Sequence, residues 1–158
     1  MKKDALAFRQ EFWDQGEMDI NGSCEWKQYE DYRKWLEHLQ LVSQGRQEGQ
    51  LPSSAYFAFH EPNHQIVGIV DIRHYLTSEY DHNGHIEYSV RPSERGKGYA
   101  TEILRLALDK ARGLGILDVR VTCGKNNLAA RKVIRRNGLV RKKEIQEAGG
   151  NAIWLYGE

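Results

Sequence analysis

The sequence predicts a single α+β domain over residues 1–158, with a central, mostly antiparallel mixed sheet and helices on both of its faces. Strand-like segments at 55–60 and 65–75 are separated by a short turn, which is typical of a hairpin. A second hairpin is expected from 139–146 and 151–156. Between the hairpins, a helical segment separates strands at 85–90 and 117–123, and this crossover predicts a parallel pair.

Two helices are expected ahead of the sheet. The first covers about 5–15, with Phe8 and Phe12 on its apolar side. The second covers about 26–43, because apolar residues recur every three or four positions between Tyr29 and Val42. We interpret this aromatic stripe as core packing.

Composition excludes several classes of protein. No apolar run approaches the ~20 residues that a membrane span needs, and Lys2 and Lys3 lead into no signal-peptide core. The two cysteines show neither CxxC nor His-rich spacing, so they predict neither a disulfide framework nor a metal site. We therefore expect a cytoplasmic protein with no metal and no membrane partner.

The charges are distributed unevenly along the chain. Up to Val90 there are 8 Lys and Arg against 15 Asp and Glu, a net −7, and from Arg91 onward there are 15 against 7, a net +8. Most of these charges are expected to lie on solvated faces. The asymmetry nevertheless favours an anionic ligand for the basic half and a cationic one for the acidic half.

A short strand, a glycine-containing turn and the start of a helix follow one another in the second half of the chain. Pro92 ends the strand, because proline donates no hydrogen bond to a sheet. Gly96 and Gly98 lack side chains that would keep a ligand from the backbone, and the first-turn amides of a helix attract anions. Arg95 and Lys97 add positive charge. This pattern predicts a phosphate-binding loop.

The loop has the sequence V-R-P-S-E-R-G-K-G-Y-A. It resembles the acetyl-CoA-binding signature of the GCN5-related N-acetyltransferase (GNAT) family, V-x-P-x-x-R/Q-x-x-G-x-G/A, with Arg95, Gly98 and Ala100 at the defining positions. A second block from Asn127 to Leu139, N-L-A-A-R-K-V-I-R-R-N-G-L, resembles a later helix of that family. Together the blocks resemble most closely a bacterial subgroup of predicted acetyltransferases.

The resemblance implies a three-layer GNAT-like fold and an acetyl-CoA-dependent N-acetyltransferase, an acyltransferase of class EC 2.3.1. The acetyl group would pass from acetyl-CoA to a primary amine by direct attack in a ternary complex. The acceptor would be a small-molecule or peptide amine that the sequence does not identify. One departure from the family is expected, because the chain starts almost in the first helix and the usual first strand is absent or very short.

The resemblance also implies where acetyl-CoA binds. The pantetheine arm is expected in a gap where two parallel strands, the fourth and fifth of the family, splay apart. A main-chain N–H near Ser89 is expected to stabilise the oxyanion. The expected cofactor-binding residues are Tyr88, Ser89, Val90, Arg95, Gly96, Lys97, Gly98, Tyr99, Ala100, Asn127, Ala130 and Arg131. Asn127 also fits the position of a helix N-cap.

The reaction needs a general base, because an ammonium group is not a nucleophile. Glu87 and His85 share one face of the strand, and Glu87 is preferred because a carboxylate also attracts a cationic acceptor. Either residue could instead be a hydrogen-bonded structural partner. Ile134 stands where many relatives have a tyrosine acid, and we interpret Cys123 and Tyr156, the remaining candidates for that role, as packing residues.

Two other functions stay open on the sequence alone. A non-catalytic acyl-CoA sensor would keep the loop and lose the acid–base groups, and Ile134 agrees with that reading. A nucleic-acid-binding module could use the basic cluster at 131–143, but no aromatic residue is interleaved there and no reading helix or zinc spacing is present. We therefore expect no nucleic-acid partner. The hairpins are compatible with a homodimer.

Overall fold

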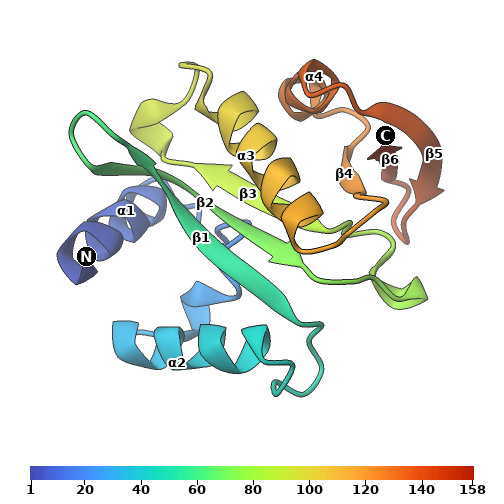
Figure 1. Cartoon of the computed structure of the whole chain (residues 1–158). Coiled ribbons are helices and arrows are strands. Elements are labelled where there is room, and N and C mark those ends of the chain that lie inside the picture. Colours follow the sequence, from blue (N-terminus) through green and yellow to red (C-terminus); the bar gives the residue numbers. More distant parts are fainter.

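The computed structural model describes every residue from Met1 to Glu158, and its strands form two three-stranded antiparallel sheets (Figure 1). Both expected hairpins are present, because β1 pairs with β2 and β5 pairs with β6. The first sheet has the order β1 (Ser53–His60), β2 (Gln65–Arg73) and β3 (Ile86–Val90), and the second has the order β4 (Val121–Gly124), β6 (Ala152–Gly157) and β5 (Val140–Gln146).

The two sheets separate between β3 and β4. One isolated antiparallel bridge, between Gly84 and Val121, joins them, and every registered strand pair is antiparallel. The parallel pair predicted across the helix is therefore not a hydrogen-bonded pair. The predicted strand 117–123 is also too long at its start, since β4 begins only at Val121 and the side chain of Leu117 is 94% exposed.

Helices cover both faces of the first sheet (Figure 1). On one face lie α1 (Lys2–Asp14) and α2 (Tyr32–Ser43), and on the other lies α3 (Tyr99–Gly113), against which α4 (Leu128–Arg136) packs. Because successive residues of a strand point to opposite faces, Ile69 joins the core under α1 and α2, whereas Val70 and Ile72 join the core under α3. The three-layer α+β architecture is therefore confirmed.

The predicted helix over 26–43 is wrong in its first part. Trp26–Gln28 forms one 3₁₀ turn, Tyr29 is extended, and α2 begins only at Tyr32. The side chain of Asp31 caps α2, because its Oδ1 accepts the N–H of Arg33 at 2.9 Å. The apolar period continues across this break because the residues on both sides of it pack into one aromatic core.

That core centres on Trp26 and Trp35, whose rings stack with centroids 3.8 Å apart. Both side chains are buried, and Tyr32 and Val42 are buried as well, which confirms core packing for these residues of the stripe; Leu36, within the same stripe, is 42% exposed. The first element along the chain is α1. No helix is both long and apolar enough to span a membrane.

Candidate functional site

The edge of β3 that faces β4 has no strand partner. On its other edge, the carbonyl of His85 accepts the N–H of Arg73, from the end of β2, at 2.7 Å. Since main-chain bonds alternate in direction along an antiparallel strand, the N–H and C=O groups of Tyr88 and Val90 point away from β2 and toward β4. The carbonyl of Val90 already accepts from Nε of Arg95 at 3.4 Å, and an extended ligand can bond to the other three groups. The N–H expected near Ser89 is therefore that of a neighbouring residue.

The turn between β3 and α3 leaves a run of main-chain amides without acceptors. From Gly96 to Thr101, no main-chain N–H donates to a protein carbonyl. Gly96 and Gly98 have φ of +77° and +88°, in the left-handed region that side chains disfavour. A Cβ on either glycine would meet nothing within 4 Å, so the loop is open to a ligand. Amides in this arrangement at a helix N-terminus bind anions such as phosphate.

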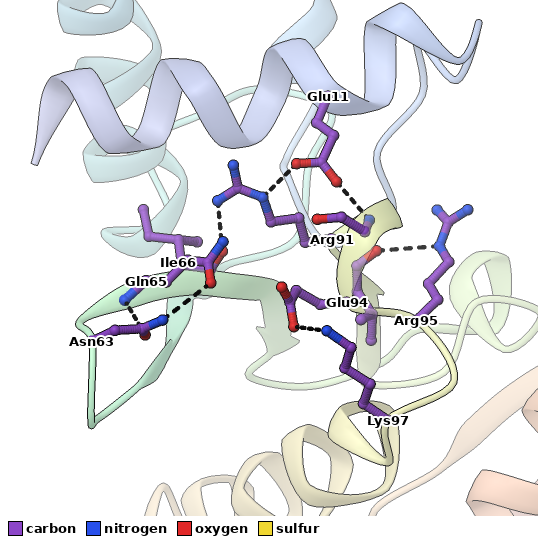
Figure 2. A network of polar contacts seen from close by, with 10 residues as sticks. Glu11, Asn63, Gln65, Ile66, Arg91, Glu94, Arg95 and Lys97 are labelled. Carbon is purple, nitrogen blue, oxygen red and sulfur yellow. Dashed lines mark hydrogen bonds and ion pairs between the residues drawn. The ribbon is translucent and has the colours of Figure 1, made fainter.

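Acidic side chains hold this loop in place (Figure 2). Glu11 of α1 accepts from Nε of Arg91 at 2.6 Å and from the main-chain N–H of Ser93 at 2.5 Å. Burial alone would raise the pKa of Glu11, but the hydrogen bonds from Ser93 and Arg91 hold it below its ordinary value. Lys97 donates to Glu94 at 3.0 Å within the loop itself. The loop is therefore pre-formed by contacts that leave its amides free.

Arg95 forms a two-pronged ion pair with Glu17, at 2.8 and 2.7 Å. The hydrogen bonds raise the pKa of Arg95 and lower that of Glu17. The guanidinium also lies 5.5 Å from the centroid of the Phe12 ring. Arg95 is thus fixed beside the loop, where its guanidinium could bind a phosphate while it stays paired with Glu17.

An open cleft of about 580 Å³ extends from the free edge of β3, along the loop, to α4. All of the expected cofactor-binding residues except Lys97 and Arg131 line this cleft. Lys132 and Arg136 line it as well, and they were predicted only as members of a basic cluster. Their spacing of four residues on a helix was the available signal, because it places both side chains on one face.

Asn127 is the N-cap of α4, because its Oδ1 accepts the N–H of Ala130 at 3.1 Å. Its side chain also lines the cleft. Arg131 is held elsewhere, since it donates to the carbonyl of Lys125 at 3.2 Å and its guanidinium lies 4.1 Å from the centroid of the Trp154 ring.

A second cavity, of about 310 Å³, lies on the opposite side of β3 from α3, beneath the loop that joins α1 to α2. Its floor includes Asp71 and Glu87, which are direct cross-strand neighbours on β2 and β3. Asn21 lines both the cavity and the cleft, and its carbonyl accepts the hydroxyl of Ser89 at 2.8 Å. The two hollows therefore adjoin across β3. The hollow along the loop is called the cleft, and the hollow with Asp71 and Glu87 is called the acceptor cavity, after the role proposed for it.

The family model that matches this chain is the acetyltransferase (GNAT) domain, over residues 2–140. The chain belongs to the GNAT acetyltransferase family. It is therefore an enzyme of the N-acetyltransferase class, EC 2.3.1. A search of curated proteins finds no significant match in sequence.

Solved structures share the fold at low sequence identity. A ribosomal-protein-S5-alanine acetyltransferase from Vibrio fischeri has a TM-score of 0.66 and 17% identity, over 99% of this chain and 87% of that one. RimL, a ribosomal L7/L12 alpha-N-protein acetyltransferase in complex with coenzyme A, has a TM-score of 0.64 and 19% identity, over 99% and 86%. A spermidine N-acetyltransferase variant from Vibrio cholerae has a TM-score of 0.59 and 14% identity, over 80% of this chain and 75% of that one.

The two candidate bases of this GNAT domain differ in their surroundings. Glu87 lines the acceptor cavity, and its Oε1 accepts from Arg73 at 2.9 Å. His85 is 6% exposed and lines neither hollow. Its Nδ1 accepts the main-chain N–H of Arg120 at 2.9 Å, and burial lowers its pKa. A neutral imidazole has one nitrogen lone pair, and here it is already used. Of the two, only Glu87 therefore lines a hollow.

Asp71 was not among the candidates from sequence, although it lies at the floor of the acceptor cavity. It is 4% exposed, and its Oδ1 has no hydrogen-bond partner. Burial raises its pKa from 3.8 to about 6, although the neighbouring Ser53 hydroxyl and Cys24 thiol act in the opposite direction. Burial and the charge of Asp71 also raise the pKa of Cys24. Only the alternation of polar and apolar residues at the end of β2 hinted at this side chain.

The tyrosine acid that many GNAT enzymes carry is absent. Ile134 is 1% exposed and belongs to the core under α3. Tyr156 is likewise 1% exposed, as expected for a packing residue. Burial raises the pKa of Cys123, so its thiol stays protonated near neutral pH. No group of three or more His, Cys, Asp and Glu side chains is placed to hold a metal ion.

Proposed function

We propose that this GNAT enzyme binds acetyl-CoA in the cleft and transfers the acetyl group directly to a primary amine in the acceptor cavity, within a ternary complex. The observation that carries the proposal is the run of unbonded amides from Gly96 to Thr101, which opens into a cleft continuous with the free edge of β3. The acceptor cavity adjoins the same strand from the other side.

The cleft matches the chemistry of coenzyme A along its length. The amides of the loop, with Arg95 beside them, would bind the pyrophosphate, and Lys132 and Arg136 would bind phosphate at the α4 side. The amide-rich pantetheine arm would pair with the free N–H and C=O groups of Tyr88 and with the N–H of Val90. One of these N–H groups would then donate to the thioester oxygen as it gains negative charge during attack.

The acceptor amine must lose a proton before it attacks. Glu87 is the proposed base, because its carboxylate lines the acceptor cavity on the strand that also borders the cleft. Arg73 donates to that carboxylate at 2.9 Å and orients it, so that it can attract an ammonium group and accept its proton, directly or through water.

The coenzyme A thiolate is proposed to leave without a protein acid. Burial raises the pKa of Tyr88 to about 12, so its phenol is a weaker acid than the departing thiol, whose pKa is about 8.5. Cys123 is not proposed as an acetyl-accepting nucleophile, because the thiolate is the nucleophilic form and burial disfavours it.

The sequence alone left a non-catalytic acyl-CoA sensor open, and the buried Ile134 in place of the usual acid is the one observation on its side, whereas membership of the N-acetyltransferase class argues against it. Turnover with any amine excludes it. The solved neighbours named for a ribosomal-protein alanine and for spermidine are consistent with an amine acceptor. Cytoplasmic location, a homodimer and the absence of nucleic-acid binding stay predictions.

Thermal unfolding with acetyl-CoA, coenzyme A and ATP tests the cofactor. At about 100 times its dissociation constant, a ligand stabilises the fold by about 2.7 kcal/mol, a rise of several degrees in Tm for a domain of this size. Acetyl-CoA and coenzyme A should raise Tm and ATP should not. Thiol release with a panel of amines then tests transfer. No shift with either coenzyme would refute the proposal.

A further inference from the structure

Asp71 is a buried carboxylate in the lining of the acceptor cavity. The protein supplies no hydrogen-bond partner for one of its two oxygens. Its side chain is almost wholly buried, and its Oδ1 is unbonded. Burying a carboxylate without a cation or a full set of donors costs several kcal/mol. The neighbouring Ser53 and Cys24 are neutral, so neither supplies the missing charge. A cationic ligand group would supply it.

The other charges of the cavity leave this position open. Asp19 is paired with Lys27, with Nζ and Oδ1 2.5 Å apart, and Glu87 is paired with Arg73. No cation of the cavity is left to pair with Asp71. The lining as a whole holds more carboxylates than cations, so its field favours a positively charged guest.

The position of Asp71 separates it from the reacting centre. Acetyl transfer would occur at the free edge of β3, whereas Asp71 lies on β2, directly across from Glu87. Neighbouring strands are about 5 Å apart, so a group bound by Asp71 lies at least one strand further from the thioester than the amine that reacts. One ammonium group does not occupy both places.

The segment from Asn21 to Glu25 lies over the cavity. Cys24 and Glu25 adopt left-handed conformations, with φ of +50° and +61°, which cost free energy for residues other than glycine. Gly22 packs so closely that an added Cβ would lie 2.6 Å from the carbonyl oxygen of Glu87. These contacts place the segment directly over the carboxylates, where it encloses the cavity.

We propose that Asp71 binds a second cationic group of the acceptor, so that the enzyme selects amines that carry another positive charge, such as aliphatic diamines. This inference rests on the proposed function and specifies its acceptor. Glu87 takes the proton of the reacting amine, and Asp71 determines which amine enters.

Matched acceptors test this inference. Rates of thiol release are measured with 1,4-diaminobutane and with n-butylamine, for the wild type, Asp71→Asn and the control Asp14→Asn. Asp14 is an exposed carboxylate at the end of α1 that accepts from Gln10 at 2.8 Å, a bond that asparagine can keep. Because Asp71→Asn removes a charged hydrogen bond to the second ammonium group, it should lower kcat/KM for the diamine roughly 10- to 100-fold, through a higher KM. The value of kcat/KM for n-butylamine should stay unchanged.

Equal efficiency of the two amines with the wild type would overturn the inference. An equal loss for both amines in Asp71→Asn, with disappearance of an ionisation from the pH profile of kcat, would also overturn it, because Asp71 would then be the base. If no amine is acetylated, the proposed function fails separately. Calorimetric titration of 1,4-diaminobutane into the coenzyme A complex then decides: tight binding that Asp71→Asn weakens at least tenfold supports a cation site, and no binding refutes it.

Discussion

Replacing Asp71 by asparagine should stabilise the protein at neutral pH. The unfolded chain has an ordinary aspartate pKa of 3.8, whereas burial raises it to about 6 in the fold. Between these values the unfolded state releases a proton that the folded state retains, so this residue lowers the stability of the fold as pH rises through the window. Above pH 6 the full loss of folding stability due to Asp71 is present, and below pH 3.8 it is absent.

The difference between 3.8 and about 6 corresponds to about 3 kcal/mol. Because asparagine leaves the same polar site unbonded, about 3 kcal/mol is the upper bound of the gain. For a domain of this size, that is a rise of about 6–12 °C in Tm at pH 7.5. The gain should fade as the pH is lowered toward 4.

Calorimetric melts of the wild type, Asp71→Asn and Asp14→Asn at half-unit steps from pH 4 to 8 measure this difference directly. Comparing each variant with the wild type at the same pH cancels the opposite trends of other groups, such as Glu11. A Tm difference for Asp71→Asn that does not change with pH would show that Asp71 is not a buried, unpaired carboxylate, and the cation site would lose its basis.

Gly98→Ala should lose about 1 kcal/mol of stability from the strained φ but still bind coenzyme A, whereas Gly98→Glu should abolish binding in calorimetry, because its carboxylate enters the cleft. Equal affinity of Gly98→Glu and the wild type would refute the loop assignment. Glu87→Gln should reduce kcat at least ~100-fold at neutral pH with unchanged coenzyme A binding, and full activity would place the base elsewhere. Glu11→Gln should lower the unfolding free energy by about 1–3 kcal/mol, since it weakens the bonds to Arg91 and the loop, and should weaken coenzyme A binding several-fold. Because the pKa of folded Glu11 lies below its ordinary value of 4.5, this stability loss should be full above pH 4.5 and should shrink as the pH falls below it; a loss that does not change as the pH is lowered through and well below 4.5 would contradict the role of its charge. Cys123→Ala should retain transfer within about twofold in a thiol-release assay, and loss of turnover with intact coenzyme A binding would point to a covalent intermediate.

The open loop with free amides was predictable because its determinants are local. Gly96 and Gly98 permit left-handed turns, and a helix that starts directly after them presents amides whatever the rest of the chain does. The cap at Asn127 was predictable for the same reason. The break before α2 was missed, because Tyr29 and Tyr32 keep the apolar period although Tyr29 is extended.

The acceptor cavity was beyond sequence reasoning because it depends on register between distant segments. Asp71 gains its importance from pairing directly with Glu87 on the next strand. The chain order alone does not specify which residues of β2 and β3 face each other. His85 illustrates the same limit, because the bond from Arg120 arises only where the two sheets meet.

We propose above all that the unbonded amides of the β3–α3 loop bind coenzyme A. The most direct test follows the main-chain amide resonances of isotope-labelled protein during a titration with coenzyme A. The largest shifts, and new protection from hydrogen exchange, should occur from Gly96 to Thr101 and at Tyr88 and Val90. Resonances that stay unchanged at saturating coenzyme A, or shifts confined to other parts of the chain, would contradict it.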